Sequence, residues 1–278
     1  MRVIRATALG MCFGVRDALQ VVHRLTDCSQ ATIHGALVHN EEVLTDLEKR
    51  GFRMSAETER GDVPATPLVV ITAHGISQRE RQRLLDAGKE LVDTTCPLVR
   101  RVHEAAQQLQ QQGYFVLVIG KRNHVEVQGI VGDLDRYAVI ENEGQVQCYE
   151  EPRLGVVCQS TTQPAELEQI LQAIKARNPG KEIRCIDTIC RPTRERQQAA
   201  RQLLGQVDAL VVVGGRHSNN TRQLVALAQA QHVPVVHVQT AADLDPSWFA
   251  PFTTVGLTAG TSTLDATIDE VHAALAAW

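Results

Sequence analysis

Short runs of apolar and β-branched residues alternate with longer stretches of helical periodicity along the whole chain. The clearest examples lie in the middle third, and this alternation is typical of parallel βαβ units. Four strands are expected there, at 114–120, 137–140, 154–158 and 182–187. The pattern therefore predicts an α/β protein whose strands are mostly parallel.

The first and last thirds of the chain repeat this order of runs. The first third has strand-like runs at 31–35, 51–54, 67–75 and 89–93. The last third has only three, at 209–215, 233–238 and 254–260. Because the run at 2–7 leads into Cys12 as 182–187 leads into Cys190, we expect the N-terminal run to supply the missing strand. We predict three pseudo-threefold lobes, each a small, mostly parallel four-stranded sheet with flanking helices, at 13–96, 97–190, and 191–278 plus 1–12.

Helix boundaries are also visible in the sequence. Ser77 and Glu80 predict a capping box, and the amphipathic stretch 98–112 ends at Gly113. We expect two further surface helices with solvated charged faces at 192–205 and 263–278. The only linker-like segment is 57–67, which is rich in proline, glycine and charge.

Composition limits the classes of partner. A net charge of −4 and an isoelectric point near 6.2 give no global attraction to nucleic acid or to anionic membranes. No apolar run approaches the roughly 20 residues of a membrane span, and the N-terminal segment lacks the core of a signal peptide. We therefore expect a cytoplasmic protein, monomeric or homodimeric, that binds neither nucleic acid nor membrane and keeps its thiols reduced.

Three of the seven cysteines share one local context. Cys12, Cys96 and Cys190 each follow a strand-like run and a small-residue turn, and each precedes a helical stretch. In the predicted lobes these positions are equivalent, so the three thiols are expected to converge on one axis. Three thiolates without a fourth suit an iron–sulfur cluster that leaves one iron open to substrate. The remaining cysteines lack this context and are interpreted as structural: Cys28, Cys148, Cys158 and Cys185.

The loops after the first and third strand of each lobe carry polar side chains. Because these loops all follow the carboxyl ends of parallel strands, they are expected to face a shared cavity. Imidazoles, hydroxyls, amides and helix N-termini with little lysine or arginine predict a pocket for a polyanion, and a diphosphate fits best. The residues of these loops are His34, His39, His74, His124, Glu126, Ser160, Thr161, Ser218, Asn219, Asn220 and Ser262, and among them His34 is interpreted as a loop-capping residue or one that supports the site from behind.

Glu126 is the one carboxylate in these loops. Partial desolvation would raise its pKa and allow it to deliver a proton to a leaving oxygen. A metal site formed by His124 and Glu126 is the rival interpretation. The chain contains no dinucleotide or P-loop fingerprint, so electrons are expected to come from a separate carrier.

Taken together, these motifs resemble the 4-hydroxy-3-methylbut-2-enyl diphosphate reductases, the LytB/IspH family. The resemblance extends over the whole chain, through GMCFGV, GALVHN, TAHGIS, DTTCPLV, HVEVQG, QSTTQ, DTIC, VVGGRHSNNT and TAGTST. It implies a three-lobed protein around a central [4Fe-4S] cluster that reductively dehydroxylates an allylic diphosphate to isopentenyl and dimethylallyl diphosphate. Ferredoxin or flavodoxin would supply the electrons.

The resemblance also implies roles for individual residues. Cys12, Cys96 and Cys190 match the family's cluster ligands, with one iron site open, and Glu126 matches its proton donor. Ser160 stands where the family has a threonine near the substrate hydroxyl. The residues that match the diphosphate-binding positions are His39, His74, His124, Ser218, Asn219, Asn220 and Ser262.

Several positions near the pocket depart from the family pattern. Val125 and Ser160 replace a proline and a threonine, and further departures are Met11, Pro192, Thr261 and Leu264. None of them removes an expected ligand, but they change turn stiffness and pocket volume. Two alternatives therefore remain open, a paralogous reductase with a different allylic or hydroxylated substrate and a non-catalytic cluster protein that senses redox state.

Overall fold

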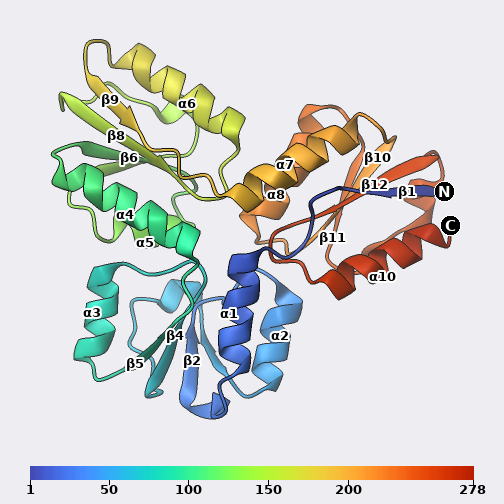
Figure 1. The fold of residues 1–278 in the computed structure, drawn as a ribbon, viewed down its shortest axis with the longest axis horizontal. Helices are drawn as coiled ribbons and strands as arrows, with labels where there is room; N and C mark the ends of the chain where they lie inside the picture. Colours follow the sequence, from blue (N-terminus) through green and yellow to red (C-terminus); the bar gives the residue numbers. More distant parts are fainter. The chain divides into compact units, whose positions relative to one another are not determined.

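The computed structural model describes all residues from Met1 to Trp278. Its strands are β1 (Arg2–Arg5), β2 (Ala31–His34), β3 (Arg53–Ser55), β4 (Leu68–Ile71), β5 (Glu90–Asp93), β6 (Phe115–Ile119), β7 (Tyr137–Ile140), β8 (Arg153–Cys158), β9 (Glu182–Cys185), β10 (Ala209–Val213), β11 (Val235–Val238) and β12 (Thr254–Ala259). They form three parallel sheets, with strand orders β3-β2-β4-β5, β7-β6-β8-β9 and β1-β12-β10-β11 (Figure 1). The predicted α/β class with three parallel four-stranded sheets is confirmed, as are all twelve strands, and the arrangement around a central cluster stays a prediction.

Helices connect these strands, as parallel pairing requires. They are α1 (Phe13–His23), α2 (Glu41–Lys49), α3 (Gln78–Asp86), α4 (Pro97–Gln111), α5 (Val125–Val131), α6 (Pro164–Arg177), α7 (Arg191–Leu204), α8 (Asn219–Ala230), α9 (Pro246–Phe249) and α10 (Asp265–Ala276). Four single 3-10 turns complete the structure: η1 (Cys28–Gln30), η2 (Glu57–Glu59), η3 (Glu143–Gln145) and η4 (Ala241–Asp243). None of the helices has the length and apolarity needed to cross a membrane.

The chain divides into two compact units, which are described separately. The first consists of Met1–Val15, His39–Val43 and Arg191–Trp278, and the second of Arg16–Val38 and Leu44–Cys190. The sheet that contains β10 lies in the first unit, and the sheets that contain β2 and β6 lie in the second. The three lobe boundaries inferred from the sequence stay a prediction.

Both faces of the β6 sheet are covered by helices, which explains its nearly continuous apolar strands. Val116 and Val118 pack with α4 and α5 on one face, and Leu117 and Ile119 pack with α6 on the other (Figure 1). The β10 sheet is built in the same way, with α7 and α8 on one face and α10 on the other. Because successive side chains of a strand point to opposite faces of the sheet, each of these sheets contributes to two separate hydrophobic cores.

The N-terminal strand completes the third sheet, as the sequence predicts. β1 pairs in parallel with β12, and Val3 lies opposite Val255. β1 comes from the start of the chain and α10 from its end, and both pack in the same core through Val3 and Ile268 (Figure 1). This closure brings the residues after β1, including Cys12, to the carboxyl edge of the β10 sheet.

Three local predictions need correction. α7 is not simply a surface helix, because Arg196 is buried and donates to the carbonyl oxygen of Gly10. Ser77 does cap α3, but the carboxylate of Glu80 lies 2.7 Å from Nε2 of His34 and does not complete a capping box. Residues 57–67 are not a loose linker, since the segment includes η2 and several of its side chains are partly buried. In each case contacts with residues distant in the sequence decide the local structure, which the pattern of neighbouring residues does not reveal.

Candidate functional site

The three expected cluster cysteines occupy one structural position in three sheets. Cys12, Cys96 and Cys190 directly precede α1, α4 and α7. Their backbone N–H groups donate to the carbonyl oxygens of three residues that follow the adjacent strand, at 2.9, 3.1 and 2.9 Å: Thr261, Ala73 and Ser160. Each thiol therefore lies at the carboxyl edge of its sheet and at a helix N-terminus, where the peptide dipoles stabilise negative charge.

The other cysteines are placed differently. None of the seven forms a disulfide. Cys158 is buried in β8, where its Sγ lies 3.3 Å from the hydroxyl of Thr188 and burial raises the pKa of the thiol to about 11. Burial also raises the pKa of Cys185, whereas Cys148 is exposed. Neutral, buried thiols such as Cys158 are poor metal ligands at physiological pH.

Glu126 is held in a buried position between two loops of the β6 sheet. It lies in the first turn of α5, and it is 2% exposed. The backbone N–H of Ser160 donates to its Oε1 at 2.6 Å, and the Ser160 hydroxyl donates to its Oε2 at 2.9 Å. Burial raises the pKa of Glu126 to about 7, against the opposing effect of the two Ser160 bonds. The carboxyl group can therefore hold a proton near neutral pH and give it up.

His124 caps the same helix and has a defined ring orientation. Its Nδ1 accepts a hydrogen bond from the backbone N–H of Glu126 at 3.1 Å. Because Nδ1 acts as the acceptor, the ring proton belongs on Nε2, which is therefore a donor. The edge of the ring meets His74, with ring centroids 5.6 Å apart and planes at 86°. Loops from two different sheets thus bring His74 and His124 together within the second unit.

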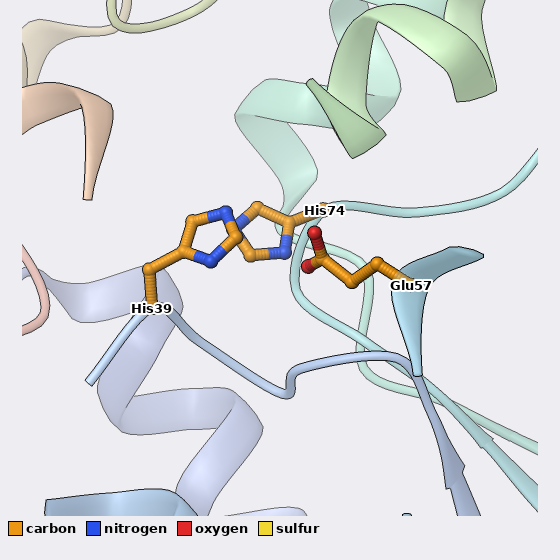
Figure 2. A group of neighbouring side chains, drawn as sticks. All are labelled: His39, Glu57 and His74. Atoms are coloured by element: carbon orange, nitrogen blue, oxygen red, sulfur yellow. The ribbon is translucent and has the colours of Figure 1, made fainter. Parts of the chain in front are cut away.

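A carboxylate that the sequence prediction did not include lies beside His74. A ring nitrogen of His74 and a carboxylate oxygen of Glu57 are within 4.8 Å of each other. Figure 2 shows the Glu57 carboxylate directed toward the His74 ring; His39, also drawn, belongs to the first unit. Glu57 lies in the segment that resembles a linker, so no local pattern marks it. Only the order ETER before a proline-rich stretch could have hinted at a structured turn.

The predicted polar residues of the first unit cluster around two strand ends. Ser218 caps α8 by accepting from the N–H of Thr221, and Asn219 and Asn220 begin that helix. The Asn220 side chain accepts from the N–H of Thr261 at 3.1 Å. The hydroxyl of Ser262 donates to the carbonyl oxygen of His39 at 3.1 Å. All four predicted residues are buried, and they lie along the carboxyl edge of the β10 sheet.

Hydrogen bonds hold the loop that carries His39 at the carboxyl edge of the β10 sheet. The Asn40 side chain donates to the carbonyl oxygen of Ser262 at 2.8 Å and accepts from the N–H of Glu42. Gly215 lies so close that a Cβ there would stand 2.5 Å from the carbonyl oxygen of His39. The glycine is therefore required by the close approach of two backbone segments. A residue from the first third of the chain is in this way built into the first unit.

The two units therefore hold different parts of the predicted site. The first contains Cys12, His39, Ser262 and the start of α8, and the second contains His74, His124, Glu126 and Ser160. His34 lies deeper, fully buried and paired with Glu80. It has a structural place in the core.

Comparison with known proteins agrees with this architecture. The family model described as LytB protein matches residues 3–276. The chain is 37% identical over 274 residues to a 4-hydroxy-3-methylbut-2-enyl diphosphate reductase of Trichlorobacter lovleyi, covering 98% of this chain and 96% of that protein. It is 33% identical to the protein of the same name from Aquifex aeolicus, covering 97% and 94%.

Two solved structures are also similar. The E-1-hydroxy-2-methyl-but-2-enyl-4-diphosphate reductase of Plasmodium falciparum superposes with a TM-score of 0.90 at 28% identity, covering 98% of this chain and 87% of that one. A structure described as (E)-4-hydroxy-3-methyl-but-2-enyl diphosphate reductase, the terminal enzyme of the non-mevalonate pathway, gives a TM-score of 0.69 at 32% identity over the full length of both chains. Since the family match and these identities extend over nearly the whole chain, the protein belongs to the LytB protein family.

Proposed function

We propose that this protein is a 4-hydroxy-3-methylbut-2-enyl diphosphate reductase. In the reaction the allylic C–O bond breaks, two electrons and two protons enter, and water leaves, so that isopentenyl or dimethylallyl diphosphate is formed. The observation that carries the proposal is the state of Glu126. A buried carboxyl group with a pKa of about 7, held at both oxygens by Ser160, is suited to protonating a poor leaving group such as hydroxide.

The donor set fits an iron–sulfur cluster. Cys12, Cys96 and Cys190 would hold a [4Fe-4S] cluster, since they occupy equivalent positions before three helices and cluster irons prefer cysteine sulfur as a ligand. When bound, the cluster supplies single electrons and an iron that can accept the substrate oxygen. No nucleotide fingerprint is present, so a ferredoxin or flavodoxin is the proposed source of electrons.

The remaining residues would bind and orient the substrate. His124 can donate from Nε2 to a diphosphate oxygen, because its Nδ1 is occupied by the N–H of Glu126. The N-terminus of α8 offers backbone N–H groups and the side chains of Ser218 and Asn219. His39, His74, Asn220 and Ser262 complete the proposed anion site. Ser160 aligns the carboxyl group of Glu126 through two hydrogen bonds.

Anaerobic purification followed by a turnover assay tests the proposal. We expect iron and sulfide in the purified protein, and turnover of 4-hydroxy-3-methylbut-2-enyl diphosphate with reduced ferredoxin, flavodoxin or a viologen. Cys12→Ser, Cys96→Ser and Cys190→Ser should each lose cluster iron. Cys148→Ser is the matched control, because Cys148 is exposed and distant from any strand end in sequence, and it should retain the iron.

A second variant separates proton delivery from assembly. Glu126→Gln should keep the visible spectrum of the cluster and lose turnover by about 10²–10⁴-fold, the usual contribution of a general acid. Wild-type rates in this variant would remove Glu126 from the mechanism. A protein that carries iron but shows no turnover would favour the alternative of a related reductase with another substrate. Ser160 makes that alternative specific, because it lacks the methyl group of the threonine that the family pattern has at this position.

A further inference from the structure

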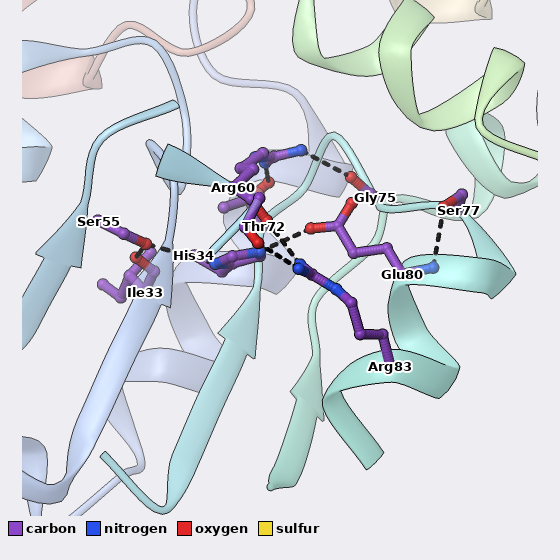
Figure 3. Close-up of polar contacts among 10 residues, drawn as sticks. Ile33, His34, Ser55, Arg60, Thr72, Gly75, Ser77, Glu80 and Arg83 are labelled. Atoms are coloured by element: carbon purple, nitrogen blue, oxygen red, sulfur yellow. Dashed lines mark hydrogen bonds and ion pairs between the residues drawn. The ribbon is translucent and has the colours of Figure 1, made fainter. Parts of the chain in front are cut away.

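The segment that carries Glu57 is fixed to α3 by its backbone. Arg83 of that helix donates one hydrogen bond to the carbonyl oxygen of Arg60 at 2.8 Å and another to the carbonyl oxygen of Gly61 (Figure 3). A third bond, from the N–H of Asp62 to the carbonyl oxygen of Glu59, closes the turn. These contacts give η2 and the residues after it one conformation, although the sequence there is rich in glycine and proline.

The side chain of Arg60 reaches from this segment to the turn that holds His74. Its Nη2 donates to Oγ1 of Thr72 at 3.0 Å, and its Nη1 donates to the carbonyl oxygen of Gly75 at 3.3 Å (Figure 3). The N–H of Gly75 in turn donates to the carbonyl oxygen of Thr72 at 3.0 Å, which closes the four-residue turn. Arg60 therefore binds both ends of the turn, and His74 lies between them.

The guanidinium of Arg60 packs closely against Gly35. A Cβ at Gly35, which has a φ of +99°, would stand 2.9 Å from Nε of Arg60. Burial lowers the pKa of Arg60, while the carboxylates of Glu80 and Glu57 oppose that shift. A buried cation is stable only where such partners compensate its lost hydration. Glu80 and Glu57 are the acids that provide this compensation for Arg60.

Glu80, the other acid near Arg60, is in contact with His34. Glu80 lies 2.7 Å from Nε2 of His34, whose Nδ1 lies 3.3 Å from the hydroxyl of Ser55 (Figure 3). This pair anchors α3 to β2 and β3 beneath the turn. Glu57 is then the acid that the same framework directs at the His74 ring, within 4.8 Å of a ring nitrogen (Figure 2).

We propose that Glu57 is a positioning residue for His74 and that Arg60 holds the two together by binding both ends of the His74 turn. A carboxylate next to one ring nitrogen fixes the rotamer and the tautomer of an imidazole. It thereby decides which nitrogen can donate to a diphosphate oxygen. The inference rests on the proposed function, because it assigns Glu57 to a histidine of the proposed anion site.

Histidine-labelled protein tests the proposal without any ligand. The ¹⁵N signals of the His74 ring, assigned by their loss in His74→Asn, report which ring nitrogen carries a proton. In Glu57→Gln these signals should change, and in Arg60→Met they should change in the same sense. Arg60→Lys keeps a donor and should restore part of the wild-type pattern. Unchanged His74 signals in a folded Glu57→Gln protein would overturn the proposal.

Glu59→Gln is the matched control. Glu59 lies in the same 3-10 turn, but it is exposed and its carboxylate accepts from the N–H of Ala56 at 3.3 Å. Its loss should leave the His74 signals unchanged. If Glu57→Gln and Glu59→Gln perturb the ring equally, the effect is a general consequence of disturbing the turn, and the specific role of Glu57 is wrong. Circular dichroism and thermal unfolding establish that each variant is folded.

Titration with inorganic pyrophosphate separates this inference from the proposed function. Glu57→Gln should weaken pyrophosphate binding by on the order of tenfold, as expected for a partner that orients a ligand-binding imidazole. In turnover the loss should appear in KM rather than in kcat. If His74→Asn binds pyrophosphate as wild type does, the role of His74 in the anion site fails, whatever the ring signals of Glu57→Gln show.

Discussion

At the scale of single residues, the protonation of Glu126 is set by a competition between burial and two hydrogen bonds. Burial favours the neutral carboxyl group, whereas both bonds from Ser160 favour the carboxylate, and burial prevails. The pKa is therefore about 7, not the ordinary 4.5. In the folded protein Glu126 binds its proton more tightly than it does in the unfolded chain, and the stability must depend on pH.

The sign of that dependence can be measured. Between about 4.5 and about 7 the native state binds the extra proton, so Glu126 destabilises the fold progressively as the pH rises through this range. The cost reaches about 3 kcal/mol above pH 7. Glu126→Gln cannot ionise, so its unfolding free energy relative to wild type should increase by up to about 3 kcal/mol between pH 4.5 and pH 8. Urea unfolding at the two pH values checks this, and a constant difference would contradict it.

Ser160 offers a second test of the same balance. Ser160→Ala removes the hydroxyl that donates to Oε2 but keeps the backbone N–H that donates to Oε1. Because the lost bond lowers the pKa of Glu126, the pKa should rise further in the variant. If the neutral acid is the active form, the basic limb of the kcat/KM profile moves to higher pH. Ser160→Thr retains the hydroxyl and should keep the wild-type limb.

At the scale of elements, the N-termini of α1, α4 and α7 are the positions on which the proposed chemistry depends. Each is set by a strand before it and by a backbone bond to the neighbouring loop. α7 is also held by side-chain hydrogen bonds. The buried guanidinium of Arg196 donates to the carbonyl oxygen of Gly10 from Nε at 2.9 Å and from Nη2 at 2.6 Å. These two bonds connect α7 to the loop before Cys12 within the first unit.

Loss of the hydrogen bonds between Arg196 and Gly10 should lower the free energy of unfolding. Arg196→Met leaves the Gly10 carbonyl oxygen without its charged donor, and hydrogen bonds of this kind contribute roughly 2–3 kcal/mol. We expect a decrease of that size in the unfolding free energy, measured by urea denaturation, and a smaller decrease for Arg196→Lys. Arg191→Met in the same helix removes only an exposed pair with Glu195 and should change stability by less than about 0.5 kcal/mol. Equal effects at both positions would refute the role of the buried bonds.

At the scale of the whole molecule, the proposed cluster ligands are distributed over two compact units. Cys12 belongs to the first unit, and Cys96 and Cys190 belong to the second. A metal cluster adds its binding free energy to the stability of the residues that hold it. Residues 39–43, which interrupt the second unit in sequence, belong to the first unit, where the Ser262 hydroxyl donates to the carbonyl oxygen of His39.

Removal of the proposed cluster tests this contribution. Anaerobic chelation of the iron should lower the midpoint of the calorimetric unfolding transition, because the metal-binding free energy is lost. Cys12→Ala should reproduce the behaviour of the chelated protein. Cys148→Ala should not, since Cys148 is exposed and lacks the strand-end context. An unchanged transition after complete loss of iron would contradict a stabilising role of the cluster.

The repeated order of strands was predictable because each strand buries both faces and therefore appears as a short apolar run. The same logic located the loops with His74, His124 and Ser160, which follow those runs directly. Glu57 and Arg60 were not predictable, because their segment has neither helical nor strand periodicity. Its conformation comes from Arg83, Thr72 and Gly75, partners that lie far along the chain.

The sequence by itself determined the three parallel sheets, the closure of the third by the N-terminal strand and the cysteine before each of three helices. These features depend on local periodicity and on the rule that parallel strands end at a common edge. Only the tertiary structure decided that Glu126 is buried against Ser160, that Arg196 holds the Gly10 loop and that Glu57 faces His74. Each of these depends on distant groups, whose burial and hydrogen bonds set charge and orientation in ways that no run of neighbouring residues encodes.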